Sequence, residues 1–148
     1  MDHSLLISQL DALTDGVANN VTNLANAAAL LFNTLEDVNW AGFYLAEGDE
    51  LLLGPFQGKP ACVRIPRGKG VCGTAFAAGE TVVVPDVHKF DGHIACDAES
   101  NSEIVVPLFK NGIFFGVMDI DSKSLSRFDE RDRETLEAFA KALEARLI

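Results

Sequence analysis

The sequence has no long hydrophobic run and few basic residues. Both features limit the classes of function that the protein could have. No apolar stretch approaches the roughly 18 residues of a transmembrane helix, and the amino-terminal MDHSLLISQLDALTDG lacks the basic start of a signal peptide. Twelve Lys and Arg stand against 22 Asp and Glu, a formal net charge of −10. The charge disfavours binding to nucleic acid and anionic lipid and favours a zwitterionic or cationic small molecule, while the lack of a signal peptide and of a membrane span predicts a cytoplasmic protein.

Cysteine is also scarce, and the three present cannot make a closed disulfide framework. Cys62, Cys72 and Cys96 are an odd number, and cytoplasmic thiols are normally reduced. They form no C-x₂₋₄-C pair, the spacing typical of structural zinc sites. His88, His93 and Cys96 are close in sequence, but their spacing matches no closed zinc site. We therefore expect no metal, and cysteines that are catalytic or simply buried.

The chain length of 148 residues fits one domain, expected to span residues 1–148. Apolar residues at helical spacing predict helices at 4–13, 17–35, 71–78 and from Asp129 to the carboxyl end. Alternation and turn signals, including Asn111-Gly112, predict strands at 39–48, 49–58, 60–66, 81–86, 103–112 and 113–122. The fold class is therefore α+β, with about six mostly antiparallel strands and the terminal helices packed on one face.

A long polar segment, Asp86 to Glu103, lies between two of these apolar strands. Irregular connections of this length are usually lids, binding loops or disordered insertions. The segment contains Cys96, and the apolar pair Ile94-Ala95 before it favours a packed cysteine. We interpret the segment as an active-site loop that presents a thiol.

The other two cysteines differ in their predicted surroundings. Free cysteine is usually buried as a small hydrophobe, and Cys62 in a short strand fits that interpretation. Cys72 falls in the first turn of a helix after Arg67 and Lys69, a position that predicts a lowered thiol pKa. The same glycine-rich stretch is not a phosphate-binding P-loop, because neither Ser nor Thr follows its glycine-lysine pair.

Two strands carry side chains that could form a polar cavity. Asp119 and Asp121 share one strand face, and Trp40 and Tyr44 share another, because strand side chains alternate. If these faces meet, two carboxylates and two aromatic rings would surround an ammonium group, and Glu103 could add a third acid. The alternative is that the aspartates end a strand in solvent and Trp40 belongs to the core.

Four stretches of the sequence resemble the GAF-domain family of free methionine-(R)-sulfoxide reductases, in motifs and in cysteine spacing. They are NWAGFYL, LGPFQGKPACVRIPRGKGVCGTA, VPDVHKFDGHIACDAESNSEIVVPL and GVMDIDS, within residues 39–122. The resemblance implies a substrate pocket formed by Trp40, Tyr44, Glu103, Asp119 and Asp121.

The resemblance also implies a mechanism without a cofactor. Cys96 would attack the sulfoxide and become a sulfenic acid, and a second thiol would convert it to a disulfide that thioredoxin reduces. Cys62 is favoured as the resolving thiol and Cys72 as a relay or alternative partner, although the residues alone do not decide between them. The sequence does not decide whether the protein is a monomer or a homodimer. The competing hypothesis is a GAF sensor that binds a cyclic nucleotide or similar ligand without turnover.

Overall fold

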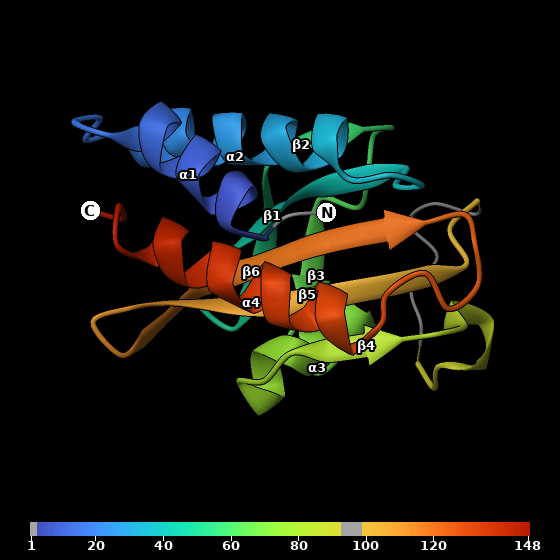
Figure 1. Ribbon diagram of the computed structural model, residues 1–148. Helices are drawn as coiled ribbons and strands as arrows, with labels where there is room; N and C mark the ends of the chain where they lie inside the picture. Colours follow the sequence, from blue (N-terminus) through green and yellow to red (C-terminus); the bar gives the residue numbers. More distant parts are fainter. Residues whose placement is uncertain (1–2, 93–98) are drawn as a thin grey trace.

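An antiparallel sheet forms the middle layer of the protein (Figure 1). The computed structural model describes residues 3–92 and 99–148, and in these residues six strands pair in the order β3-β2-β1-β6-β5-β4. Every pair is antiparallel. The strands are β1 (Trp40–Glu47), β2 (Glu50–Gly58), β3 (Arg64–Pro66), β4 (Val82–Val84), β5 (Ser102–Lys110) and β6 (Ile113–Ser122).

The α-helices of the described residues lie on both faces of the sheet, with α3 (Gly70–Ala78) on the face opposite the others (Figure 1). The helices are α1 (His3–Thr14), α2 (Asn20–Thr34), α3 (Gly70–Ala78) and α4 (Glu130–Glu144), with a short 3₁₀ helix η1 (Val87–Lys89). The main core joins α1, α2 and α4 to inward residues of the central strands, among them Phe43, Met118 and Ile120. A second core joins α3 to the opposite face. No described helix is long and apolar enough to span a membrane.

Local sequence signals account for the ends of these elements. The β5–β6 hairpin turns at Asn111 and Gly112, which have φ of 52° and 76°, and the β1–β2 hairpin turns at Gly48 with φ of 61°. These left-handed conformations favour glycine and asparagine. Asp129 caps α4 in a reciprocal capping box with Asp132. The predicted α+β fold, the hairpins and the terminal helices on one face are confirmed.

The largest departure from the predicted elements lies between β2 and β3. The third strand was predicted over 60–66, but only Arg64–Pro66 pairs with β2. Pro60 has no N–H to donate to a strand ladder, and the carbonyl groups of Lys59 and Cys62 accept hydrogen bonds from side chains instead. The second helix likewise begins at Asn20 rather than at residue 17, because Asn19 caps it.

Candidate active site

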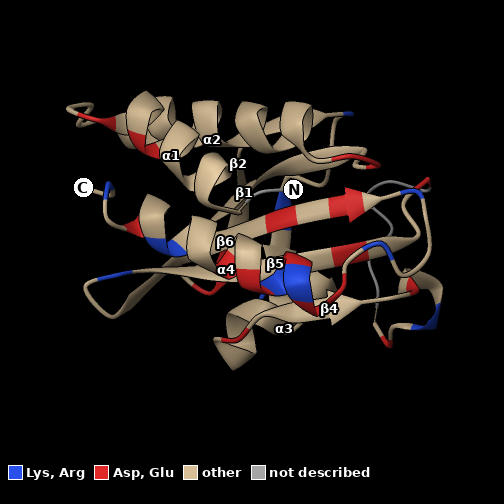
Figure 2. Ribbon diagram, viewed as in Figure 1, with Lys and Arg blue, Asp and Glu red and all other residues tan. Residues whose placement is uncertain are grey.

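The register of three neighbouring strands brings the predicted acids to one face of the sheet. In the β5–β6 pair Glu103 lies opposite Asp121, and in the β1–β6 pair Trp40 lies opposite Asp121. Asp119 lies two residues earlier on β6, opposite Gly42. Met118 and Ile120 point to the helical layer, so alternation turns both aspartates to the opposite side. Red bands mark acidic residues along β5 and β6 in Figure 2.

Two of the three carboxylates are almost fully removed from water. The exposed fraction is 5% for Asp119 and 8% for Glu103, whereas Asp121 is half-buried. Burial raises the pKa of Glu103 well above its usual range, and the charges of Asp119 and Asp121 raise it further. Burial and these like charges therefore favour the protonated form of Glu103. The alternative interpretation, aspartates that end a strand in solvent, is wrong for Asp119.

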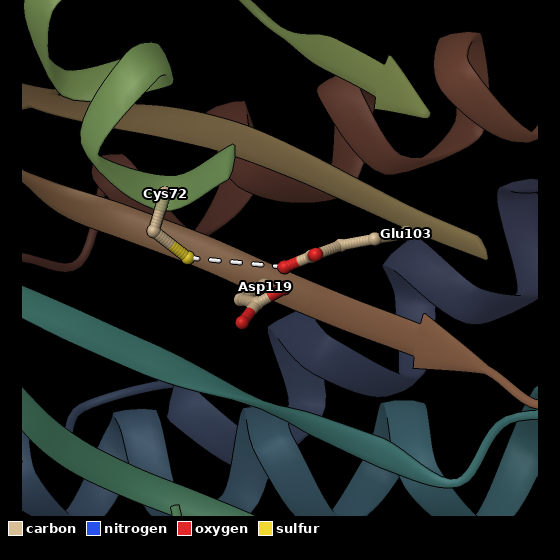
Figure 3. Close-up of side chains that lie close together, drawn as sticks. All are labelled: Cys72, Glu103 and Asp119. Atoms are coloured by element: carbon tan, nitrogen blue, oxygen red, sulfur yellow. Dashed lines mark hydrogen bonds between the residues drawn. The ribbon is translucent and has the colours of Figure 1, made fainter. Parts of the chain in front are cut away.

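Cys72 faces the same acids from the other side of the site (Figure 3). Its Sγ lies 4.0 Å from Oε2 of Glu103, and only 4% of the residue is exposed. Burial raises the pKa of the Cys72 thiol, and Asp119 and Glu103 add to the effect in that order. Cys72 is a protonated thiol at neutral pH.

The prediction of a lowered pKa for Cys72 is therefore wrong, although its place in the first turn of a helix is correct. The basic residues that motivated the prediction lie outside the site. Arg67 is exposed, lies over the ring of Phe76 at 4.9 Å, and pairs with Asp49 at 3.6 Å. Lys69 is also exposed. Burial and acidic neighbours raise the pKa of the Cys72 thiol by more than the positive end of the helix dipole lowers it.

Cys72, Glu103 and Asp119 are also the described residues that come closest to a metal-binding arrangement. One ligand atom from each lies within 4.8 Å of the other two. A cation would act against the protonated forms of Cys72 and Glu103, which burial and neighbouring acids favour by raising the pKa of both. The arrangement is thus chemically suited to holding and delivering protons.

The aromatic residues of β1 form the wall of the site next to the acids. Trp40 and Tyr44 are 2% and 1% exposed. The indole stacks on Phe56, with centroids 5.2 Å apart, and on Tyr44 at 6.0 Å. A side chain at Gly42 would collide with Phe56 and Trp40, so only glycine fits beneath the stack. Phe56 was not predicted, although its position opposite Gly42 on β2 follows the same alternation.

Both polar atoms of this aromatic pair donate to the segment that contains Cys62. Trp40 Nε1 donates to the carbonyl of Lys59 at 3.0 Å, and the Tyr44 hydroxyl donates to the carbonyl of Cys62 at 2.9 Å. Burial is the main cause that raises the pKa of Tyr44, followed by Asp119, so the phenol remains a donor. Tyr44 was predicted to bind substrate, but its hydroxyl already has a partner in the protein.

The two described cysteines differ in covalent state. Cys62 is half-buried and disulfide-bonded, whereas Cys72 is free. Cys96, the predicted nucleophile and partner of Cys62, lies outside the described residues, so this pairing stays a prediction. His93 also lies outside them. His88 Nε2 lies 2.9 Å from Asn101 Oδ1, at the base of the predicted loop.

The two ends of the predicted active-site loop are tied to the surrounding structure. At its start, the side chain of Asp86 accepts from the His88 backbone N–H at 3.0 Å, and the loop end at Asn101 accepts from Val87 N–H at 2.9 Å. Glu99 lies between two lysines, 2.9 Å from Lys59 Nζ and 3.0 Å from Lys123 Nζ. Hydrogen bonds from these lysines lower the pKa of Glu99. The lysine pair could not be identified from sequence, because Lys59 and Lys123 are distant from the loop along the chain.

Comparisons with known proteins agree with this geometry. A model of the GAF domain matches residues 8–147. The free methionine-R-sulfoxide reductase of Escherichia coli (strain K12) is 55% identical over 134 residues, which cover 90% of this chain and 81% of that protein. The structure of reduced fRMsr of Staphylococcus aureus superposes with a TM-score of 0.96 at 53% identity, covering 99% of this chain and 96% of that one.

A further similar structure is the free methionine-R-sulfoxide reductase of Neisseria meningitidis in complex with its substrate. Its TM-score is 0.93 at 49% identity, and the match covers 97% of this chain and 87% of that one. The similarity therefore extends over almost the whole length of both chains, including every strand that contributes to the acid cluster.

Proposed function

Because the chain belongs to the GAF-domain family, and within it to the free methionine-R-sulfoxide reductases, we propose that it reduces free L-methionine (R)-sulfoxide to methionine with thiols as the source of electrons. The enzyme is thus an oxidoreductase that acts on a sulfur group. The observation that carries the proposal is the cluster of Glu103, Asp119 and Asp121 on one sheet face, with Glu103 and Asp119 buried, because this reaction needs both an acid and a receptor for a cation.

The chemical step is assigned to Cys96, following the family resemblance. The thiolate of Cys96 attacks the sulfoxide sulfur while an acid protonates the sulfoxide oxygen, since oxide itself is a very poor leaving group. The oxygen ends on the cysteine sulfur, so one thiol is oxidised to a sulfenic acid and one sulfoxide is reduced to methionine. Glu103 supplies the proton in this proposal, supported by its raised pKa.

Recognition of the free amino acid is assigned to the two aspartates. Asp119 and Asp121 lie on the same strand face, and in this proposal their carboxylates receive the substrate ammonium group. A methionine sulfoxide inside a peptide lacks that ammonium group and would leave the carboxylates without a cation, so it is rejected. Trp40 provides the apolar surface against which the S-methyl group packs.

The cycle closes through a disulfide. The Cys62 thiol attacks the sulfenic acid of Cys96, water leaves, and a disulfide forms; thioredoxin then reduces it by thiol–disulfide exchange. This choice of resolving thiol is supported by the disulfide at Cys62 and the free state of Cys72. A protonated, buried Cys72 is a weak nucleophile, which favours Cys62 as the partner.

The proposal is tested by comparing four substrates: the free (R) and (S) sulfoxides and their peptide-bound forms. Consumption of each is followed with thioredoxin and its reductase, or with dithiothreitol. We expect the free (R) form to be preferred, and Cys96→Ser to abolish turnover. A preference for a peptide-bound (S) form would overturn the proposal. Absence of turnover together with thermal stabilisation by a cyclic nucleotide would favour the sensor hypothesis instead.

A further inference from the structure

The segment that carries Cys62 is irregular, yet its backbone is fixed at several points. It runs from residue 59 to 63, between β2 and β3, and forms neither helix nor strand. Its carbonyl groups accept from Trp40 Nε1, from the Tyr44 hydroxyl and, at Val63, from the backbone N–H of Leu53 at 2.9 Å. All three donors belong to the sheet, so the position of the segment is set by β1 and β2.

The bond from Tyr44 is the one that reaches the cysteine itself. Tyr44 is 1% exposed and stacked beside Trp40, which leaves its ring little freedom to move. Its hydroxyl lies 2.9 Å from the carbonyl oxygen of Cys62, within the same residue whose sulfur is in the disulfide. A rigid side chain on a central strand thus fixes the backbone from which the Cys62 sulfur projects.

We propose that Tyr44 is a positioning residue for the resolving thiol, and that its hydroxyl aligns Cys62 for disulfide formation instead of binding substrate. The inference rests on the proposed function for the identity of the sulfenic acid. In the step concerned, the Cys62 sulfur attacks the sulfenic sulfur, the new S–S bond forms, and the hydroxyl departs as water with the thiol proton. Disulfides form only within a narrow range of backbone separations, about 4.4 to 6.8 Å between Cα atoms, so the backbone position of Cys62 controls the rate.

The test uses Tyr44→Phe, which keeps the ring and removes only the donor. The matched control is Thr14→Val, because Thr14 is fully buried in α1 and its hydroxyl donates to the Leu10 carbonyl at 2.9 Å, far from the site. Reduced protein is mixed with one equivalent of the free (R) sulfoxide in the presence of dimedone, which traps sulfenic acid. Mass spectrometry then gives the ratio of dimedone adduct to disulfide, and chromatography gives the methionine released.

We expect Tyr44→Phe to raise the ratio of adduct to disulfide, counted per methionine released in the first turnover, about fivefold or more, the effect of one lost hydrogen bond. The Thr14→Val variant should show the wild-type ratio. A wild-type ratio of adduct to disulfide in Tyr44→Phe would overturn the inference. A raised KM for the sulfoxide together with that ratio would instead support a role of Tyr44 in substrate binding. Equal slowing of methionine release and of disulfide formation would also contradict the inference, because a general loosening of the site would slow both steps.

A second arm keeps this result separate from the proposed function. One equivalent of hydrogen peroxide replaces the sulfoxide and oxidises the thiol directly to the sulfenic acid. If the wild type releases no methionine from the sulfoxide but Tyr44→Phe still raises the adduct ratio after peroxide, the proposed function is wrong and the positioning role stands. A wild-type ratio in the peroxide arm overturns the positioning role, whatever the sulfoxide arm shows.

Discussion

Replacing Glu103 with glutamine should stabilise the protein and slow the enzyme, and the stabilisation should grow with pH. The buried Glu103 binds a proton in the folded protein far above its usual pKa, mainly because of burial and then because of Asp119 and Asp121. The unfolded chain releases that proton near pH 4.3. Between these two pKa values the folded state binds more protons than the unfolded state, so the free energy of unfolding falls as pH rises.

The size of the effect follows from one proton. Each pH unit in that interval lowers the free energy of unfolding of the wild type by up to about 1.4 kcal/mol relative to a variant that cannot ionise there. The side chain of Glu103→Gln is neutral in both the folded and the unfolded protein, so the free energy of unfolding of this variant does not fall with pH for this reason. Cys72 and Tyr44 also have raised pKa values, but their unfolded groups titrate only above about pH 8. Titrating groups that both proteins share cancel in the comparison, so the difference in stability between pH 5 and pH 8 reports on Glu103.

The assay is urea unfolding of the reduced wild type and Glu103→Gln at each pH unit from 5 to 8, with Glu134→Gln as the control. Glu134 is an exposed glutamate on α4, so its amide variant should follow the wild type at every pH. In parallel, kcat of Glu103→Gln should fall by about 10²-fold or more, because the amide cannot deliver a proton. A stability difference between Glu103→Gln and wild type that does not change with pH would refute the reasoning, since Glu103 would then bind no extra proton in the folded state.

Three further predictions concern other residues of the site. At pH 8 the reduced protein should be alkylated by iodoacetamide more slowly at Cys72 than at Cys62, because burial and acids disfavour the Cys72 thiolate; faster modification of Cys72 in a peptide map would restore the prediction made from its basic neighbours. Asp121→Asn should raise KM for the free sulfoxide about tenfold or more with a smaller change in kcat, and an unchanged KM in steady-state kinetics would remove Asp121 from ammonium binding. Gly42→Ala should lower the free energy of unfolding by about 1 to 3 kcal/mol in urea, since its methyl group would collide with Phe56; a wild-type urea midpoint would show that the aromatic stack yields easily.

The parts of the fold that depend on neighbours in sequence could be predicted. The hairpin at Asn111-Gly112 and the cap at Asp129 depend on a few adjacent residues, and both are confirmed. The common face of Asp119 and Asp121 follows from strand alternation and needs no tertiary information. The irregularity between Leu108 and Phe109 could not be predicted, and it shifts the register set by the turn so that Glu103 lies opposite Asp121 rather than Ile120.

The incorrect prediction for Cys72 shows where reasoning from sequence neighbours fails. Arg67 and Lys69 are close to Cys72 along the chain, but their charged groups lie in solvent, where water screens them. Glu103 and Asp119 are distant in sequence and lie against the thiol in a dry site, where a charge acts strongly. For the same reason the sequence could not identify the acceptor of the Tyr44 hydroxyl, the carbonyl of Cys62, because that contact depends on how the segment after β2 is placed.

The pairing of β1 with β6 also determines when the site can exist during folding. This pair joins residue 40 to residue 121, and the intervening chain contributes the other strands of the sheet. Closing so long a loop is entropically costly, and folds rich in such distant contacts assemble slowly. Until that closure, the carboxylates of β5 and β6 are hydrated and repel one another weakly. We therefore expect the electrostatic work of gathering these carboxylates to fall late in folding, when the hydrogen bonds of the sheet and the packing of the helical core can offset it.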